Sequence, residues 1–342
     1  MTTADHGAYP APAFIGVDLG GTKILARWID PVSGRARGRH KAVTPTTGPD
    51  DVLEAVADTV RALDPEGRAV AVGVGVPGFV VDGRVVVRCA NIAGWDHPID
   101  VAEHLGTALR RPVVVGNDVN CGALAEFRLS VGQPEIHPPS HGDPPPAESV
   151  ATTARRDLLA VFVGTGVGGG LILDGQLVTG PRGMVGEIGH VTTVPGGALC
   201  GCGGRGHLEA YAGRAGLERR AREAAAAGRP NKLVDLAGPS TIKSRHLARA
   251  LEEGCEVTAG LVADATDALA LVIGNAATLL DLRHVVLGGG VVDKLGQPFV
   301  DQIAASPSFG GLGPDLCALR LARRLDDAGV VGAAILAADR FG

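Results

Sequence analysis

A glycine-rich stretch that carries metal-ligand side chains, residues 183–209, constrains the fold of this chain most strongly. It reads GMVGEIGHVTTVPGGALCGCGGRGHLE and contains two imidazoles and two thiols, those of His190, Cys200, Cys202 and His207. These donor types close a tetrahedral shell around zinc in structural sites. The glycines between them allow the tight backbone turns that such a shell needs. The stretch therefore predicts a structural zinc site, which would fix the flanking carboxylates of Glu187 and Glu209 in space.

The cysteines have a simpler interpretation as ordinary buried thiols. A disulfide between Cys200 and Cys202 is disfavoured, because a loop with one intervening residue strains the bridge. The six cysteines are otherwise scattered along the sequence. That pattern is typical of reduced thiols in a cytoplasmic protein.

Length and composition favour an α/β protein of about two domains. The 342 residues are 45% apolar but only 3% aromatic, and the net charge is −5 with no basic block. Nucleic acid and an anionic membrane surface are therefore poor partners. The first residues lack the pattern of a signal peptide, and we expect no apolar stretch long enough to span a bilayer.

Hydrophobic patterning predicts alternating strands and helices. Strands are expected at residues 14–19, 23–29, 69–76, 85–88, 112–115, 158–163, 171–173, 176–178 and 285–287. Helices are expected at 50–63, 99–109, 119–127, 209–227, 259–280 and 330–340. A strand, a glycine turn and a second strand occur near residue 20 and again near residue 166. This weak internal repeat indicates two similarly built halves.

Two segments do not fit this pattern of elements. Residues 1–12 form a loose leader, and residues 131–150 are rich in proline and polar side chains. Such a composition cannot form a packed element, so we expect a surface loop at 131–150.

The first glycine turn lies beside an acid, in the sequence Asp18-Leu19-Gly20-Gly21-Thr22-Lys23. Backbone amides of Gly20 and Gly21 can approach phosphate oxygens, Thr22 and Lys23 add a hydroxyl and a charge, and Asp18 can hold Mg²⁺. A plain hairpin turn explains the glycines equally well.

The second glycine turn, residues 164–169, matches the pattern G-x-G-x-x-G. A dinucleotide site requires these glycines to open a helix, whereas a strand follows here. We therefore reject a Rossmann site and expect a second phosphate-facing hairpin.

Asn117 and Asp118 stand where a strand ends and a helix begins. Asp is a common helix N-cap, which would account for Asp118 without any function. A carboxylate that accepts a proton from a substrate hydroxyl is the alternative. The residue pattern leaves both interpretations open.

Four motifs together resemble the ROK family of repressors and sugar kinases: DLGGTK, GNDVN, GTGVGGG and GEIGH followed by CGCGGRGHLE. The resemblance covers roughly residues 13 to 337. It implies an α/β fold of the two-lobed actin-like ATPase (ribonuclease H-like) type, with a cleft between the lobes. Residues 1–115 would form the N-terminal lobe, with helix 328–342 packed back on it, and residues 116–327 the C-terminal lobe.

The resemblance also implies site residues. ATP phosphates and Mg²⁺ would be held by Asp18, Gly20, Gly21, Thr22, Lys23, Gly164, Thr165 and Gly166, with Gly288 and Gly289 on the adenosine side. The sugar would contact Gly78, Asn91, Asn117, Asp118, Glu187, His190 and Glu209. Asp118 would be the catalytic base, and His190 would serve both zinc and sugar. The usual third cysteine of the zinc motif is replaced here by His207.

The implied activity is ATP-dependent phosphorylation of the primary (6-)hydroxyl of a hexose, glucose or a glucose-like amino sugar. The alternatives are a specialised kinase for kanosamine, N-acetylmannosamine or a cyclitol, and a non-catalytic sugar-responsive regulator. The regulator is disfavoured, because only thirteen residues precede Phe14, too few for a DNA-binding module. The resemblance further implies a homodimer or homotetramer.

Overall fold

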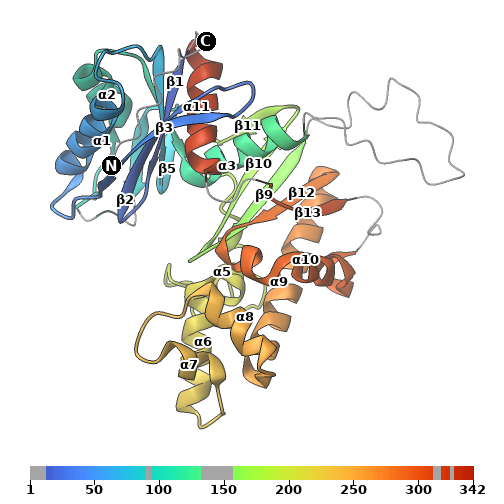
Figure 1. The fold of residues 1–342 in the computed structure, drawn as a ribbon. Helices are drawn as coiled ribbons and strands as arrows, with labels where there is room; N and C mark the ends of the chain where they lie inside the picture. The colour runs from blue at the N-terminus through green and yellow to red at the C-terminus, as the bar shows by residue number, and fades with distance from the viewer. Residues whose placement is uncertain (1–12, 90–91, 93, 132–156, 311–316, 324–326) are drawn as a thin grey trace, which may run out of the picture. The chain divides into compact units, whose positions relative to one another are not determined.

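The computed structural model describes residues 13–89, 92, 94–131, 157–310, 317–323 and 327–342 (Figure 1). It divides the chain into two compact units. The first comprises Met1–Arg156, Gly170–Val185 and Asp326–Gly342, and the second comprises Asp157–Gly169 and Gly186–Leu325. The leader 1–12, Asn91 and residues 132–150 of the proline-rich segment lie outside the described residues.

The first unit contains a five-stranded sheet in the order β3-β2-β1-β4-β8. Its strands are β1 (Phe14–Leu19), β2 (Lys23–Ile29), β3 (Ala36–Val43), β4 (Ala71–Val76) and β8 (Val113–Asn117). β1 pairs antiparallel with β2, which confirms the predicted hairpin. β1, β4 and β8 run parallel, so their carboxyl ends lie at one edge of the sheet, where α/β proteins place their ligand sites.

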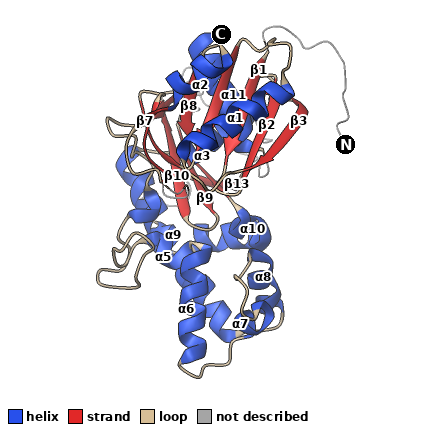
Figure 2. Cartoon of the chain, turned by 90° about the vertical axis from the view of Figure 1, so that its left-hand side faces the viewer, coloured by secondary structure: helices blue, strands red, loops and turns tan. Residues whose placement is uncertain are grey.

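Both faces of this sheet are covered by helices (Figure 2). Alternate residues of β1 point to opposite faces, as the period of a strand requires. Ile15 and Val17 join a core with α1 (Pro49–Leu63) and α2 (Val101–Leu109). Phe14 joins a second core with α3 (Asp118–Glu126) and α11 (Ala328–Phe341).

Glycine allows α11 to lie directly on the sheet backbone. A Cβ added at Gly16 would overlap the carbonyl of Val330, and one added at Gly73 would overlap the carbonyl of Ala333. The close approach of α11 therefore depends on the absence of side chains at these two strand positions.

Three short strands form a separate sheet in the first unit: β5 (Gly78–Val81), β6 (Val85–Cys89) and β7 (Ile99–Asp100). They pair antiparallel, and Asp100 then caps α2 by accepting the Glu103 N–H. β3 and β5 were not predicted, and β7 had been assigned to the start of the helix predicted at 99–109. β3 lies at the edge of its sheet, and its residues are charged or partly exposed. The apolar alternation that marks a strand in a sequence is therefore weak here.

A second five-stranded sheet has the order β11-β10-β9-β12-β13. Its strands are β9 (Leu158–Val163), β10 (Val167–Leu173), β11 (Gln176–Val178), β12 (His284–Gly288) and β13 (Ala318–Leu321). Counted within each sheet, both sheets have the strand order third, second, first, fourth, fifth. The predicted internal repeat is thereby confirmed at the level of topology.

The helices of the second unit are α5 (Leu208–Ala212), α6 (Arg214–Ala226), α7 (Lys232–Ala237), α8 (Ser244–Glu252), α9 (Glu256–Leu280) and α10 (Gly290–Ala305). Short helical turns are η1 (Phe127–Val131), in the first unit, and η2 (Ile188–His190) and η3 (Pro307–Phe309), in the second. α9 is long and apolar enough to cross a membrane by length and composition alone, contrary to our expectation. In the most apolar stretch of α9, 67% of the segment is buried inside the protein. α9 packs against α5, α6 and α10, as a core helix does.

Two predicted elements of the second sheet and its helices differ from the structure, and α7, α8, α10 and β13 were not predicted. The glycines at 168–170 belong to β10 rather than to a turn. An added Cβ at Gly169 would lie 2.8 Å from the Gly186 carbonyl oxygen, so this strand position requires glycine. The single helix predicted over 209–227 is interrupted at Gly213, whose extended backbone separates α5 from α6.

The division into units also differs from the boundary expected after residue 115. α3 packs closely against α11 and therefore belongs to the first unit together with β8. The strand segment Gly170–Val185 is assigned to the first unit as well.

Candidate active site and metal site

The loop between β1 and β2 is compact and leaves its middle open to solvent. The Gly20 N–H donates to the Lys23 carbonyl at 2.9 Å, and the Thr44 hydroxyl donates to the Gly20 carbonyl at 2.6 Å. Gly21, Thr22 and Lys23 are exposed. The loop therefore offers backbone amides, a hydroxyl and an ammonium group, which suit an anionic phosphate.

Asp18 lies two residues before this loop, at the parallel edge of the first sheet. Burial raises the pKa of the Asp18 carboxyl above its usual value, and the Lys23 charge lowers it to a smaller extent. A bound cation would offset the cost of keeping this carboxylate ionised. Asp18 is thus suited to hold Mg²⁺, directly or through water.

Asn117, not Asp118, is the N-cap of α3. The Asn117 side-chain oxygen accepts from the N–H groups of Val119 (2.9 Å) and Asn120 (3.0 Å), and its amide donates to the Gly78 carbonyl (3.1 Å). Capping therefore accounts for the Asn117 oxygen, and the Asn117 amide joins this residue to Gly78; the family resemblance assigned both residues to the sugar.

Asp118 is the first residue of α3, and its Oδ1 accepts the Val119 N–H at 2.9 Å. The cap is already supplied by Asn117, so capping does not explain why an acid stands at position 118. The carboxylate lies at the edge of the first sheet where the parallel strands have their carboxyl ends. Asp18 and the first glycine loop belong to the same unit.

The loop between β9 and β10 repeats the first one. The Gly164 N–H donates to the Gly166 carbonyl at 2.9 Å, and Thr165 is exposed. The start of α6 holds this loop from behind, because the N–H groups of Arg214 and Ala215 donate to the carbonyls of Gly164 and Thr165, both at 3.0 Å. The Arg214 guanidinium also donates to the Thr165 hydroxyl at 2.8 Å.

Gly289, the residue that follows β12, borders the same loop. It has a positive φ of 88°, and an added Cβ would lie 2.6 Å from the Val163 carbonyl oxygen, one residue before the loop. At Gly288 an added Cβ would lie 2.8 Å from the Phe162 ring. Both positions therefore require glycine where β12 passes the second loop.

The four predicted zinc ligands come together. One donor atom from each of them lies within 4.8 Å of the donor atoms of the other three. Cys200 Sγ is 3.9 Å from His190 Nδ1, and Cys202 Sγ is 3.3 Å from His207 Nδ1. A tight turn holds the thiols, since the Cys200 N–H donates to the Gly204 carbonyl at 2.7 Å.

The donor set fits zinc, since two sulfurs and two imidazole nitrogens at such spacing match a closed tetrahedral site. Burial raises the pKa of the Cys200 thiol to about 11, and metal binding would offset this by stabilising the thiolate. All six cysteines are free, as expected for reduced thiols.

His190, one of the four ligands, connects this metal site to Glu187. His190 presents Nδ1 toward Cys200, while its Nε2 lies 3.7 Å from the Glu187 carboxylate. A metal on Nδ1 would leave the proton on Nε2, the arrangement commonly found for carboxylate-paired zinc ligands. Burial raises the pKa of Glu187, the His190 charge lowers it, and the Glu209 charge raises it.

Glu209 connects the metal site to the second glycine loop. Its Oε1 lies 3.5 Å from Cys200 Sγ, and its Oε2 accepts the Val167 N–H at 3.1 Å. An added Cβ at Gly166 would lie 3.0 Å from the Glu209 carboxyl carbon. In the second unit, one carboxylate thus contacts both a thiol of the metal site and the glycine loop that could bind phosphate.

The structure groups the predicted site residues within each unit. Asp18, the first loop, Gly78, Asn117 and Asp118 belong to the first unit. The second loop, Glu187, His190, Glu209, the two thiols, His207 and the glycines of β12 belong to the second. The sequence analysis missed Arg214, because it treated 209–227 as one helix; Gly213 is the signal that marks the break.

Two curated relatives are similar to this chain over nearly its whole length. The chain is similar to the glucokinase of Streptomyces coelicolor, with 32% identity over 330 residues that cover 94% of this chain and 96% of the relative. It is also similar to the N-acetylmannosamine kinase of Salmonella typhi, with 31% identity over 329 residues, 94% of this chain and 97% of the relative.

Among solved structures, the fold is similar to that of a ROK family glucokinase from Streptomyces griseus in complex with glucose and AMPPNP. The TM-score is 0.75 at 32% identity, and the match covers 96% of this chain and 99% of the other. ROK sugar kinases have the actin-like ATPase fold, so the predicted fold class is confirmed.

The ROK family model matches residues 14–134 and 147–340. The residues between the two matched segments, 135–146, lie within the proline-rich segment 131–150 and are not matched by the family model. Because the match takes in nearly the whole sequence, the chain belongs to the ROK family.

Proposed function

We propose that this protein is an ATP-dependent sugar kinase that phosphorylates the primary (6-)hydroxyl of a hexose, glucose or a glucose-like amino sugar. The observation that supports this best is the position of Glu209. Its carboxylate accepts the N–H of Val167, the residue that follows the second glycine loop, and lies beside the buried thiol of the metal site. A group suited to sugar hydroxyls is thereby fixed next to a group suited to phosphate.

The sugar is bound by Glu187, His190 and Glu209 in this proposal. Carboxylates accept hydrogen bonds from ring hydroxyls, and the Nε2 of His190 is the ring nitrogen that faces away from the thiols. Asn117 stays a prediction on the sugar side, and its side chain is held by the α3 amides and the Gly78 carbonyl. Its contribution is to orient the neighbouring Asp118. Asn91 stays a prediction on the sugar side.

Asp118 acts as the general base. It takes the proton of the primary hydroxyl while the hydroxyl oxygen forms a bond to the γ-phosphorus of ATP, and the bond from that phosphorus to the β–γ bridging oxygen breaks. Positioning and charge stabilisation dominate such a transfer. The glycine loops provide both through backbone amides, together with Thr22, Lys23 and Thr165.

Mg²⁺, when bound, neutralises part of the phosphate charge, and Asp18 is the residue that would hold it. Zinc, when bound by His190, Cys200, Cys202 and His207, would keep the sugar-binding groups rigid. These four residues form a closed set of donors, so the metal is assigned a structural role and no part in the chemistry.

The activity is tested by measuring ADP release with a panel of glucose, kanosamine, N-acetylmannosamine and cyclitols. Asp118→Asn should lower kcat by about a hundredfold or more while sugar binding persists in calorimetry, because only the proton acceptor is lost. Asp50→Asn is the control: Asp50 is also an acid in the first turn of a helix, α1, and stands outside the site. Near-normal turnover by the Asp118→Asn variant would contradict the base assignment.

A specialised kinase is the second candidate, since the relatives include both a glucokinase and an N-acetylmannosamine kinase at comparable identity. A kcat/KM for one amino sugar or cyclitol that exceeds that for glucose by about a hundredfold would establish it. Absence of turnover with every member of the panel, together with sugar-dependent binding to DNA, would favour a regulator instead. Light scattering would test the expected homodimer or homotetramer.

A further inference from the structure

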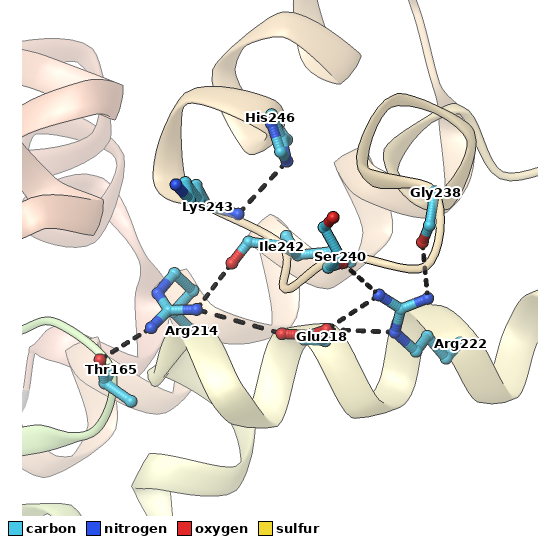
Figure 3. Close-up of polar contacts among 9 residues, drawn as sticks. All are labelled: Thr165, Arg214, Glu218, Arg222, Gly238, Ser240, Ile242, Lys243 and His246. Carbon is cyan, nitrogen blue, oxygen red and sulfur yellow. Dashed lines mark hydrogen bonds and ion pairs between the residues drawn. The ribbon is translucent and has the colours of Figure 1, made fainter.

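Arg214 connects three parts of the second unit through one guanidinium group (Figure 3). It donates to the Thr165 hydroxyl at 2.8 Å and to the Ile242 carbonyl at 2.6 Å, and it lies 4.0 Å from the Glu218 carboxylate. Its side chain is only 19% exposed. The second glycine loop, α6 and the segment before α8 are therefore held by a single, mostly buried side chain.

The chemistry of this contact fixes the direction of the Thr165 hydroxyl. A guanidinium has five N–H donors and no acceptor, so the Thr165 oxygen must accept the bond. The hydroxyl proton is then directed to another acceptor. Thr165 is exposed, and its backbone carbonyl is already bound by the Ala215 N–H. The loop thus presents a polarised hydroxyl donor to its surroundings, which suits an anionic ligand.

We propose that Arg214 is a positioning residue for the nucleotide phosphates. It holds Thr165 as a hydrogen-bond donor toward a phosphate oxygen, and it places a positive charge directly behind the loop. This inference rests on the proposed kinase function and adds to it a residue that touches neither the sugar site nor the metal ligands.

The same network contains a matched control. Arg222, two turns further along α6, donates to the carbonyls of Gly238 (3.1 Å) and Ser240 (2.7 Å), and it binds Glu218 at 3.0 Å (Figure 3). Arg222 therefore stabilises the same segment by the same chemistry as Arg214. It makes no contact with Thr165 that Figure 3 or the hydrogen bonds of the described residues record.

The test compares Arg214→Met with Arg222→Met in steady-state kinetics and in direct binding of a non-hydrolysable ATP analogue. Arg214→Met should raise the KM and Kd for the nucleotide about tenfold, equivalent to about 1.4 kcal/mol, while the KM for sugar stays within about twofold. Arg214→Met and Arg222→Met should lower the thermal midpoint of unfolding to a similar degree. Arg222→Met should nevertheless change the nucleotide KM by less than about twofold. Arg214→Lys should have a nucleotide KM between those of the wild type and Arg214→Met. An ammonium group retains the positive charge but cannot donate to Thr165 and Ile242 with the planar geometry of a guanidinium.

A double-mutant cycle sharpens the result. Thr165→Val should raise the nucleotide KM by itself, and the combined Arg214→Met/Thr165→Val variant should be little worse than the poorer single variant. Additive effects, an unchanged nucleotide KM in Arg214→Met, or equal effects of Arg214→Met and Arg222→Met would each overturn the positioning role. A wild-type protein that phosphorylates no sugar with ATP would instead contradict the proposed function itself.

Discussion

Replacing Gly166 by alanine should weaken sugar binding through Glu209. The new Cβ would overlap the Glu209 Oε2 and lie 3.0 Å from its carboxyl carbon. Carbon atoms in ordinary contact are about 3.5–4.0 Å apart, so the carboxylate has to retreat by up to about 1 Å. The side chain can do so, because its far end is flexible and only its tip is obstructed.

The magnitude follows from the bonds that this retreat breaks. The Oε2 of Glu209 accepts the Val167 N–H at 3.1 Å, and a shift of about 1 Å takes the pair beyond hydrogen-bond distance. A hydrogen bond to a charged group contributes about 1.5–3 kcal/mol. If half of that is recovered through water, we expect a loss of about 1 kcal/mol in stability. The displaced carboxylate should raise the sugar KM about tenfold.

Gly164→Ala supplies the control in the same loop, because its added Cβ would meet no atom within 4 Å. Chemical denaturation and an ADP-release assay would be run on both variants. The Gly164→Ala protein should keep its stability and its sugar KM to within about twofold. A Gly166→Ala protein with the wild-type sugar KM would refute the idea that the Glu209 carboxylate, in the position seen here, binds the sugar.

Three further predictions concern the metal, the magnesium ligand and the packing of α11. Purified protein should contain about one equivalent of zinc by elemental analysis, and Cys202→Ser should lose it and raise the sugar KM more than the ATP KM; less than about a tenth of an equivalent in the wild type would exclude the site. Asp18→Asn should lower kcat by about a hundredfold or more. Because burial raises the folded-state pKa of Asp18, the folded protein binds the extra proton, and the contribution of this group to stability falls as pH rises from the unfolded to the folded pKa. At neutral pH the ligand-free Asp18→Asn protein should therefore have a higher urea midpoint than the wild type. A lower midpoint would contradict the conclusion that the ionised Asp18 destabilises the ligand-free fold. Gly73→Ala should cost about 1–3 kcal/mol in urea denaturation, because its Cβ would overlap the Ala333 carbonyl, whereas Gly260→Ala, exposed within α9, should gain about 0.5–1 kcal/mol.

Local patterning was enough to predict both glycine hairpins and the donor set of the metal site. Apolar runs and a glycine pair specify a hairpin at short range, and His190, Cys200, Cys202 and His207 lie close in sequence. The repeat seen near residues 20 and 166 extended to the strand order of whole sheets.

Features that depend on distant contacts were not predicted. Gly169 looked like part of a turn, but it serves the close approach of Gly186, a neighbour that spacing does not reveal. The sequence left Asp118 open as a helix cap, but the cap is Asn117, one residue earlier, whose backbone is extended and whose side chain accepts the Val119 and Asn120 N–H groups. Arg214 has meaning only through Thr165 and Ile242, which lie 49 and 28 positions away.

The position of α11 in the sequence bears on how the protein is made. The first sheet is synthesised early, yet the helix that seals one of its faces follows the whole of the second unit. While the ribosome is still translating that unit, Phe14, Leu25 and Val114 have no α11 to cover them. The nascent chain therefore carries this apolar sheet face without α11 while the second unit is synthesised, a stage at which exposed apolar surface promotes aggregation.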